Sequence, residues 1–211
     1  MEAHNTRNTY SKTHEILVGL FVFSLLLSCI TSFIAICSPD WAKSVLGEVK
    51  AGVYINANYE MYIYGLWQYC SIPVNSGRIC RTYIYIIYDN WIQYCQFCSI
   101  LAILLNISAF LYWFWNKANS RIQFSVKYLA YTSVIMGLNA FISLTIIIVY
   151  AFRYKQSLIN SAMESNNLSF KIMSNLTWAF GLYSIGTIFS IIGTLSSALN
   201  YFVTKKLINS N

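Results

Sequence analysis

The sequence predicts an all-α membrane protein: a bundle of four transmembrane helices that carries a small extracellular antiparallel β-sheet. Three observations predict this class. Only 10% of the residues are charged, against about a quarter in soluble domains. Four long segments contain no Asp, Glu, Lys or Arg. The long polar stretch between the first two segments shows the period-two alternation of β-strands.

Each uncharged segment is long enough to cross a bilayer. The segments cover residues 16–39, 90–116, 128–152 and 172–204, and an α-helix needs about 20 residues to span the hydrocarbon core. We therefore expect a single tetraspan domain over residues 1–211. Its spans lie at about 16–37, 92–115, 128–152 and 177–203, and its larger loops at about 38–91 and 153–176.

The first span could instead be a cleaved signal peptide. Its apolar stretch from Ile16 to Cys37 is longer than the 7–15 residues or so of a signal-peptide core, and no clean A-x-A site follows. We therefore interpret it as a retained span.

Lys and Arg residues set the expected orientation. Cytoplasmic loops of membrane proteins carry an excess of these residues. The short loop after the second span and both termini are basic and contain the residues Arg7, Lys12, Lys117, Arg121, Lys127, Lys205 and Lys206. We expect both termini in the cytoplasm of a plasma-membrane protein and the two larger loops outside.

The charges of the first larger loop cancel. It holds four basic and four acidic residues: Lys43, Lys50, Arg78, Arg81, Asp40, Glu48, Glu60 and Asp89. The net charge of +7 therefore reflects topology and the basic second extracellular loop. Nucleic-acid binding needs a basic patch on a soluble face, and no such face is expected.

Three Asn-x-Ser/Thr sequons occur, and their positions bear on the topology. Asn167 lies in the shorter extracellular loop and is a possible glycosylation site. Asn175 lies close to the membrane, and Asn106 lies inside a span and should not be glycosylated.

Cysteines of the expected extracellular loop predict a disulfide. Cys70 and Cys80 face an oxidising compartment, so we expect them to pair. Cys95-x-x-Cys98, at the start of the second span, could be a redox or metal motif. No Cys or His cluster stands nearby to complete a zinc site, so we interpret these two as small apolar residues.

Alternating residues predict strands in the first larger loop. The stretches "AGVYINAN", "MYIYGLW" and "RTYIYII" each alternate with period two. Turns are expected at Asn58–Glu60 and at Pro73–Gly77, and the cystine would staple the second hairpin.

Catalysis and secondary transport are not expected. His4 and His14 are confined to the amino-terminal segment, and no span carries a charged residue. Intramembrane ionisable groups are typical of proton relays and ion pathways. We expect no cofactor and no metal.

A stripe of small residues runs along the fourth span. Gly186, Ser190, Gly193 and Ser197 fall at offsets 0, 4, 7 and 11, which places them on one helix face. Such stripes let helices approach closely in lipid. The stripe predicts packing within the bundle, with homo-oligomerisation as the alternative.

The order Trp41, Gly65-Leu66-Trp67, Cys70, Cys80 resembles the W–GLW–C–C signature of the claudin superfamily. That superfamily includes claudins, the peripheral myelin and epithelial membrane proteins, and the calcium-channel gamma subunits. The resemblance covers the whole chain: four spans, a long first loop and cytoplasmic termini. It implies a left-handed four-helix bundle with a small extracellular antiparallel sheet.

The chemistry of these residues suggests how they seat the sheet. Gly65 lets backbone or a ring approach closely, and Trp41 and Trp67 suit the interface between helix ends and lipid headgroups. We expect a structural role for these residues. The alternative is that Trp67 contacts a partner directly.

Departures from the claudin pattern limit what the resemblance implies. The start of the second span, "DNWIQYCQFCSI", lacks the Arg-Ala pair usual in claudins, and the shorter extracellular loop lacks proline. The chain ends "LINSN" rather than Tyr-Val, so we do not expect a PDZ scaffold as partner.

The resemblance implies a protein of cell–cell contacts that binds itself or related tetraspan proteins in cis and in trans. It would serve adhesion or act as a paracellular barrier or selectivity element. The alternatives are an auxiliary subunit of an ion channel or receptor, and a membrane organiser similar to the myelin proteins.

Overall fold

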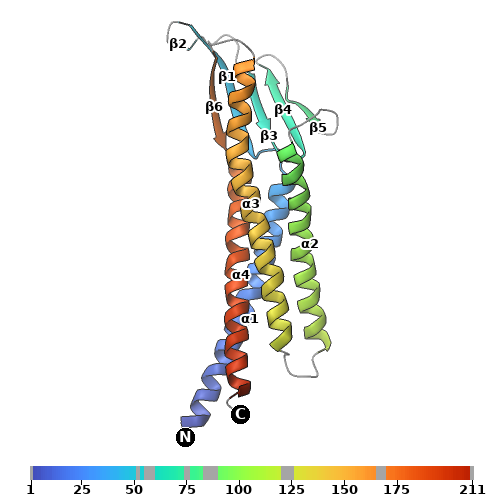
Figure 1. Ribbon diagram of the computed structural model, residues 1–211, viewed down its shortest axis with the longest axis vertical. Coiled ribbons are helices and arrows are strands. Elements are labelled where there is room, and N and C mark those ends of the chain that lie inside the picture. The colour runs from blue at the N-terminus through green and yellow to red at the C-terminus, as the bar shows by residue number, and fades with distance from the viewer. Residues whose placement is uncertain are drawn as a thin grey trace. The chain divides into compact units, whose positions relative to one another are not determined.

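A computed structural model describes residues 2–50, 53–54, 60–73, 77–82, 90–119, 126–164 and 170–209 (Figure 1). The protein is mostly helical, with a small antiparallel sheet. The helices are α1 (Glu2–Cys37), α2 (Asn90–Asn119), α3 (Val126–Glu164) and α4 (Trp178–Asn209).

All four helices contain a segment that is long and apolar enough to cross a membrane. These segments are Lys12–Cys37, Asn90–Asn116, Tyr128–Gln156 and Trp178–Lys206, which confirms the four predicted spans. The chain has only two prolines, Pro39 and Pro73, and neither interrupts a helix. Because a residue before proline disfavours the helical conformation, Pro39 accounts for the end of α1 at Cys37.

Helix α3 continues past the predicted span to Glu164, so part of the loop at about 153–176 is helical. The residues after Phe152 include Arg, Lys, Gln, Leu, Ala and Met and no Gly or Pro. These are good helix formers. The charges that end the apolar segment therefore do not end the helix.

The chain divides into two compact units, and every helix contributes to both. Unit 1 consists of Met1–Ser32, Ile100–Leu144 and Ile185–Asn211, and unit 2 of Phe33–Ser99 and Thr145–Ser184. Unit 1 is entirely helical where it is described. Unit 2 contains the remaining helix segments and the strands among the described residues.

Unit 1 has an apolar core that includes Phe21, Leu25, Ala109 and Met136. Large apolar side chains also cover its outside, as at Trp115, Phe141 and Phe202. Water-soluble domains rarely expose so much contiguous apolar surface. This outward-facing apolar surface is suited to lipid.

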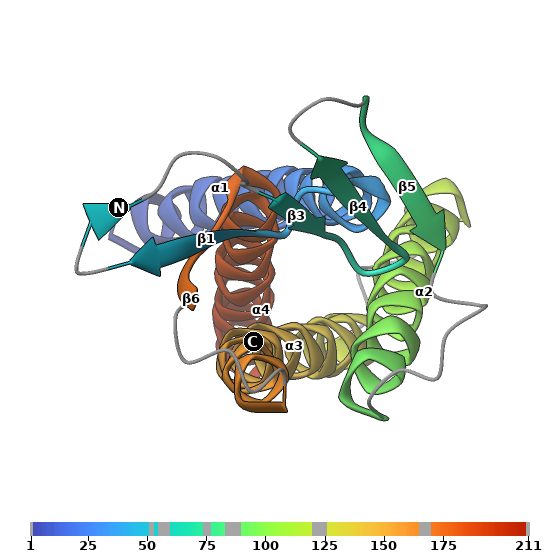
Figure 2. The ribbon, with the colours of Figure 1, turned by 90° about the horizontal axis from the view of Figure 1, so that it is seen from above.

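The sheet of unit 2 is antiparallel throughout. Five strands lie between α1 and α2, and β6 lies between α3 and α4. They are β1 (Ala42–Lys50), β2 (Val53–Tyr54), β3 (Glu60–Tyr64), β4 (Gln68–Pro73), β5 (Ile79–Thr82) and β6 (Phe170–Leu176). The order is β2-β1-β3-β4-β5, and β6 also pairs with β1. Figure 2 shows β1, β3, β4 and β5 in succession.

The predicted strands are confirmed only in part. Of "AGVYINAN", the structure describes Val53–Tyr54, which form β2, and the rest lies outside the described residues, as does most of "RTYIYII". In "MYIYGLW", β3 ends at Tyr64, so the expectation that a strand carries Trp67 is wrong. The amide of Gly65 donates to the carbonyl of Gln68 at 2.8 Å, and this bond closes a turn there.

Candidate functional site

Trp41 lies between the end of α1 and the start of β1, and its side chain is fully buried. Its ring packs against Tyr150 of α3 and against Tyr183 and Phe180 of α4. The ring centroids are 5.0, 5.2 and 6.1 Å away, respectively. Aromatic pairs at such spacings add stability beyond the area that they bury. Trp41 therefore joins three helices of unit 2 at the base of the sheet.

The polar groups of Trp41 are all bonded. Its indole Nε1–H donates to the carbonyl of Ala35 at 2.6 Å, and its backbone N–H donates to the carbonyl of Tyr64 at 2.8 Å. Its own carbonyl accepts the N–H of Thr177 at 3.0 Å. The carbonyls in the last turn of a helix lack partners inside the helix. Trp41 therefore completes the end of α1 and fixes the starts of β1 and α4.

The expected place of Trp41 at the lipid headgroups is wrong. No part of its side chain is exposed, because Tyr150, Phe180 and Tyr183 enclose the ring and Ala35 accepts its only donor. Trp67 differs, since it is 37% exposed in the turn between β3 and β4.

Gly65 and Leu66 seat the same turn on the helices. A Cβ atom at Gly65 would lie 2.8 Å from the Cα of Pro39 and 3.0 Å from the carbonyl oxygen of Ser38. The backbone here therefore has room only for glycine. Leu66 is fully buried, and its carbonyl accepts the side-chain amide of Gln96 from α2 at 2.7 Å. The expected close approach at Gly65 is thus present in the structure.

Cys70 and Cys80 form the predicted disulfide, with an S–S distance of 2.10 Å. They are register partners on β4 and β5, so the cystine links these two strands directly. The predicted turn at Pro73–Gly77 lies largely outside the described residues, and Pro73 itself belongs to β4. All four residues of β5 are exposed. Among the described residues β5 pairs only with β4, which leaves one side of this strand as an edge of the sheet.

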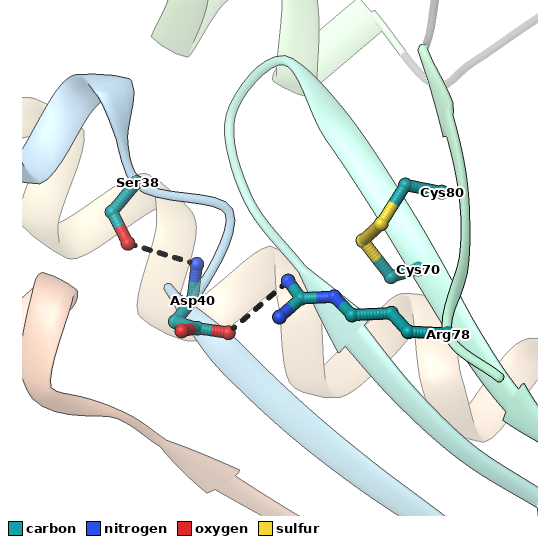
Figure 3. Close-up of a disulfide and its surroundings, with 5 residues drawn as sticks. All are labelled: Ser38, Asp40, Cys70, Arg78 and Cys80. Carbon is teal, nitrogen blue, oxygen red and sulfur yellow. Dashed lines mark hydrogen bonds and ion pairs between the residues drawn. A yellow bond between two sulfur atoms is a disulfide. The ribbon is translucent and has the colours of Figure 1, made fainter.

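An ion pair lies beside the cystine. Arg78 Nη2 is 3.6 Å from Asp40 Oδ1 (Figure 3), and the two side chains are 39% and 21% exposed. The backbone N–H of Asp40 donates to Ser38 Oγ at 3.1 Å. The Thr177 hydroxyl donates to the Asp40 carbonyl. A partly exposed pair of this length contributes about 1 kcal/mol or less, so it orients the hairpin more than it stabilises the fold.

Tyr64, the last residue of β3, extends the group of aromatic rings around Trp41. Its ring lies 5.4 Å from that of Tyr154, and burial raises the pKa of the Tyr64 phenol above its ordinary value. This tyrosine therefore stays neutral at physiological pH and acts as a packing group.

The stripe on α4 lies inside unit 1. Gly186, Ser190, Gly193 and Ser197 are all buried. A Cβ atom at Gly186 would lie 2.6 Å from Thr31 Oγ1, and one at Gly193 would lie 2.9 Å from Met136 Cε. Helices α1 and α3 of the same chain therefore cover the stripe, which agrees with packing within the bundle.

Sequence reasoning missed a buried polar cluster built on this stripe. Asn139 of α3 donates to Asn106 Oδ1 of α2 at 2.9 Å and to Ser190 Oγ of α4 at 2.8 Å. Ser190 Oγ lies 2.6 Å from Ser28 Oγ of α1. We call these four residues the polar cluster. The sequence analysis considered only charged residues inside the spans and therefore did not find this cluster. Asn106 and Asn139 in the second and third spans, and the serines spaced by four residues in the first span, could have indicated it.

The remaining predicted positions are the Cys95-x-x-Cys98 motif and the sequons. Cys95 and Cys98 are buried in α2, and no group of three potential metal ligands occurs in the part of the chain that the structure describes. Asn167 lies outside the described residues. Asn106 is buried in the polar cluster, where an attached glycan would not fit.

No family model matches the chain, and no curated protein matches its sequence significantly.

Proposed function

We propose that the chain is a claudin-like membrane protein of cell–cell contacts, whose extracellular sheet contacts neighbouring copies and limits or selects paracellular passage. The proposal places both termini in the cytoplasm, in accordance with the basic residues at the termini and in the loop after the second span. In this proposal the apolar outer surface of the helices contacts lipid.

The sheet edge at β5 carries this proposal. A strand edge presents backbone N–H and C=O groups that another chain can pair with. The cystine between Cys70 and Cys80 holds β5 on β4, and Ile79 on β5 is 48% exposed. The signature residues Trp41, Gly65 and Leu66 are buried beneath the sheet, whereas Trp67 reaches the surface. The buried signature residues thus attach the sheet to the helices, whereas β5 and Trp67 remain accessible to a neighbouring copy.

Any paracellular pore would take its charge from the first loop. Four basic and four acidic residues cancel there, so net charge favours neither cations nor anions. The placement of single residues such as Glu60 or Lys50 would then decide a residual preference.

Expression in an epithelial line stripped of its own claudins tests the proposal. We expect continuous staining along contact lines and a changed transepithelial conductance. Tags at either terminus should be reached by antibodies only after permeabilisation. Diffuse surface staining, unchanged conductance and a co-purifying channel would favour the auxiliary-subunit function and defeat the junctional one.

A matched pair of variants tests the role of the β5 edge. Ile79→Lys places a charge on the exposed edge strand, a change that blocks edge pairing in natural sheets. Gly77→Lys adds the same charge two positions earlier, outside the strand, where an added Cβ atom meets nothing within 4 Å. We expect Ile79→Lys to abolish the contact lines and Gly77→Lys to preserve them. Equal behaviour of the two variants would contradict the assignment of β5.

A further inference from the structure

The polar cluster of unit 1 contains one buried atom that none of its members satisfies. Asn139 donates both of its side-chain amide hydrogens, one to Asn106 and one to Ser190. Its side-chain oxygen Oδ1 is buried and has no hydrogen-bond partner among the described residues. In a membrane-spanning bundle, bulk water cannot satisfy such an atom. The hydrogen-bonded network therefore needs one more donor at Asn139.

Ser24 of α1 is a second buried group without a partner. Its side chain is fully buried, and its Oγ forms no hydrogen bond with the described part of the chain. Hydroxyls in helices often donate to a carbonyl one turn earlier, as those of Ser133 and Ser184 do. Ser24 makes no such bond, so its hydroxyl is available to a ligand. Ser28, a member of the polar cluster, lies one turn further along the same face of α1.

These two groups border the same part of α4. A Cβ atom at Gly193 would lie 3.5 Å from Ser24 Cβ and 2.9 Å from Met136 Cε. Asn139 follows Met136 by almost one turn of α3, and it contacts Ser190, which lies almost one turn from Gly193. Ser24 and Asn139 are therefore separated by about one helical turn, or about 5 Å, along the bundle. Two hydrogen bonds of about 2.8 Å through one shared molecule span a similar distance.

The chemistry of these atoms determines the class of ligand. An amide oxygen only accepts hydrogen bonds, whereas a hydroxyl both donates and accepts, so the ligand must be small and must donate. The polar cluster consists of neutral amides and hydroxyls. A cation would bring a full charge into the bundle without a carboxylate among these ligands, which is costly. Water is neutral, donates twice and accepts, and a buried water molecule typically makes about three hydrogen bonds.

We propose that the polar cluster binds one ordered water molecule, which donates to Asn139 Oδ1 and bonds to the hydroxyls of Ser24 and Ser28. The Ser28 hydroxyl can serve as the third ligand because its bond to Ser190 uses only part of its capacity. The water completes a network that joins α1, α2, α3 and α4. This inference is independent of the proposed junctional function.

Hydroxyl-radical footprinting of the full chain in lipid nanodiscs tests the proposal. X-ray radiolysis converts bound water into hydroxyl radicals, which oxidise the side chains beside it. Met136 is the reporter, because methionine oxidises readily and its buried side chain lies next to Gly193. We expect Met136 to be oxidised at doses that oxidise Met61, which is 36% exposed. Oxidation of Met61 without oxidation of Met136 would overturn the proposal.

A matched pair of serine variants makes the test specific. Ser24→Ala removes a ligand of the water but no hydrogen bond to the described residues. It should remove most of the oxidation of Met136 and lower the unfolding temperature. Ser108→Ala is the control, because Ser108 is exposed and donates to the carbonyl of Leu105 in its own helix. It should leave the oxidation of Met136 unchanged.

The opposite behaviour of Ser24→Ala would contradict the proposal. Without a bound water, the variant deletes a buried unsatisfied hydroxyl, which should raise the unfolding temperature and leave the oxidation of Met136 unchanged. Ser28→Ala removes the third ligand and should also reduce this oxidation, which covers the case in which Ser24→Ala fails to fold. A cooperative unfolding transition serves as the folding check for all three variants.

Exchange of the buffer cation distinguishes a bound cation from water. The unfolding temperature is measured in sodium, potassium and N-methylglucamine chloride at equal ionic strength. A water site predicts the same unfolding temperature in all three salts. Stabilisation by sodium or by potassium alone would identify a bound cation and overturn the assignment of water.

Discussion

The indole Nε1–H of Trp41 donates a 2.6 Å hydrogen bond to the carbonyl oxygen of Ala35, six residues earlier in the chain. This bond joins Trp41, the residue before β1, to the last turn of α1. Together with the ring contacts to Tyr150 and Tyr183, it links α1, α3 and α4 at the start of β1 in unit 2.

Trp41→Ala should lower the free energy of unfolding by about 3–5 kcal/mol, the range for deletion of a large buried aromatic side chain. Trp41→Phe should cost less, because it keeps an aromatic ring and removes mainly the bond to Ala35. Trp115→Ala is the control, since Trp115 is 69% exposed. Denaturant unfolding in detergent measures all three, and an equal loss for Trp115→Ala would contradict the assignment.

Gly65→Ala should destabilise the protein by about 1–3 kcal/mol, as overpacking of a well-packed site does. The added methyl group would meet backbone atoms of Ser38 and Pro39, which cannot move as a side chain can. At Gly77, an added Cβ atom meets nothing within 4 Å. Gly77→Ala should therefore be close to neutral in the same thermal unfolding assay, and a similar loss in both variants would speak against close approach at Gly65.

Removal of both cysteines of the disulfide should lower stability by about 2.5–3 kcal/mol on the chain-entropy estimate for so short a loop. Non-reducing peptide mapping should link Cys70 to Cys80. Cys70→Ser alone should reduce surface expression more than the double variant does, because it leaves Cys80 exposed and reactive. A link from Cys70 to Cys37, or from Cys80 to Cys95, would refute the predicted pairing.

The pair Asn106 and Asn139 should show energetic coupling. Polar pairs between membrane helices couple by about 0.6 kcal/mol on average and up to about 1.7 kcal/mol. A double-mutant cycle with Asn106→Ala and Asn139→Ala measures this value through the unfolding free energies. The same cycle with Leu138, which is 50% exposed, in place of Asn139 should show coupling near zero. Coupling near zero in the first cycle would mean that the polar cluster does not join α2 to α3.

The spans and the disulfide could be predicted from the sequence because each depends on local properties. The spans follow from long uncharged segments, and the Cys70–Cys80 pair follows from two cysteines in one expected extracellular loop. Trp41 and Gly65 were singled out by their resemblance to a signature, but the burial of Trp41 depends on helices that are distant in sequence.

Strands β1 and β6 were missed because their pairing is non-local. In "AKSVLGEVK" charged residues interrupt the apolar alternation, and "FKIMSNL" alternates poorly. The two strands nevertheless pair from Ala42↔Leu176 to Glu48↔Phe170. Only the folded chain brings these residues together. The polar cluster was missed for a related reason, because uncharged Asn and Ser do not interrupt a hydrophobic span.

Contact between copies on opposing cells is the most direct test of the central claim, that the stapled sheet mediates assembly at cell contacts. Cells that express the chain with a green tag are mixed with cells that express it with a red tag and with cells that lack it. We predict enrichment of both colours at borders between two expressing cells, and none at borders with non-expressing cells. Uniform signal at every border, or equal enrichment against cells that lack the protein, would contradict the account.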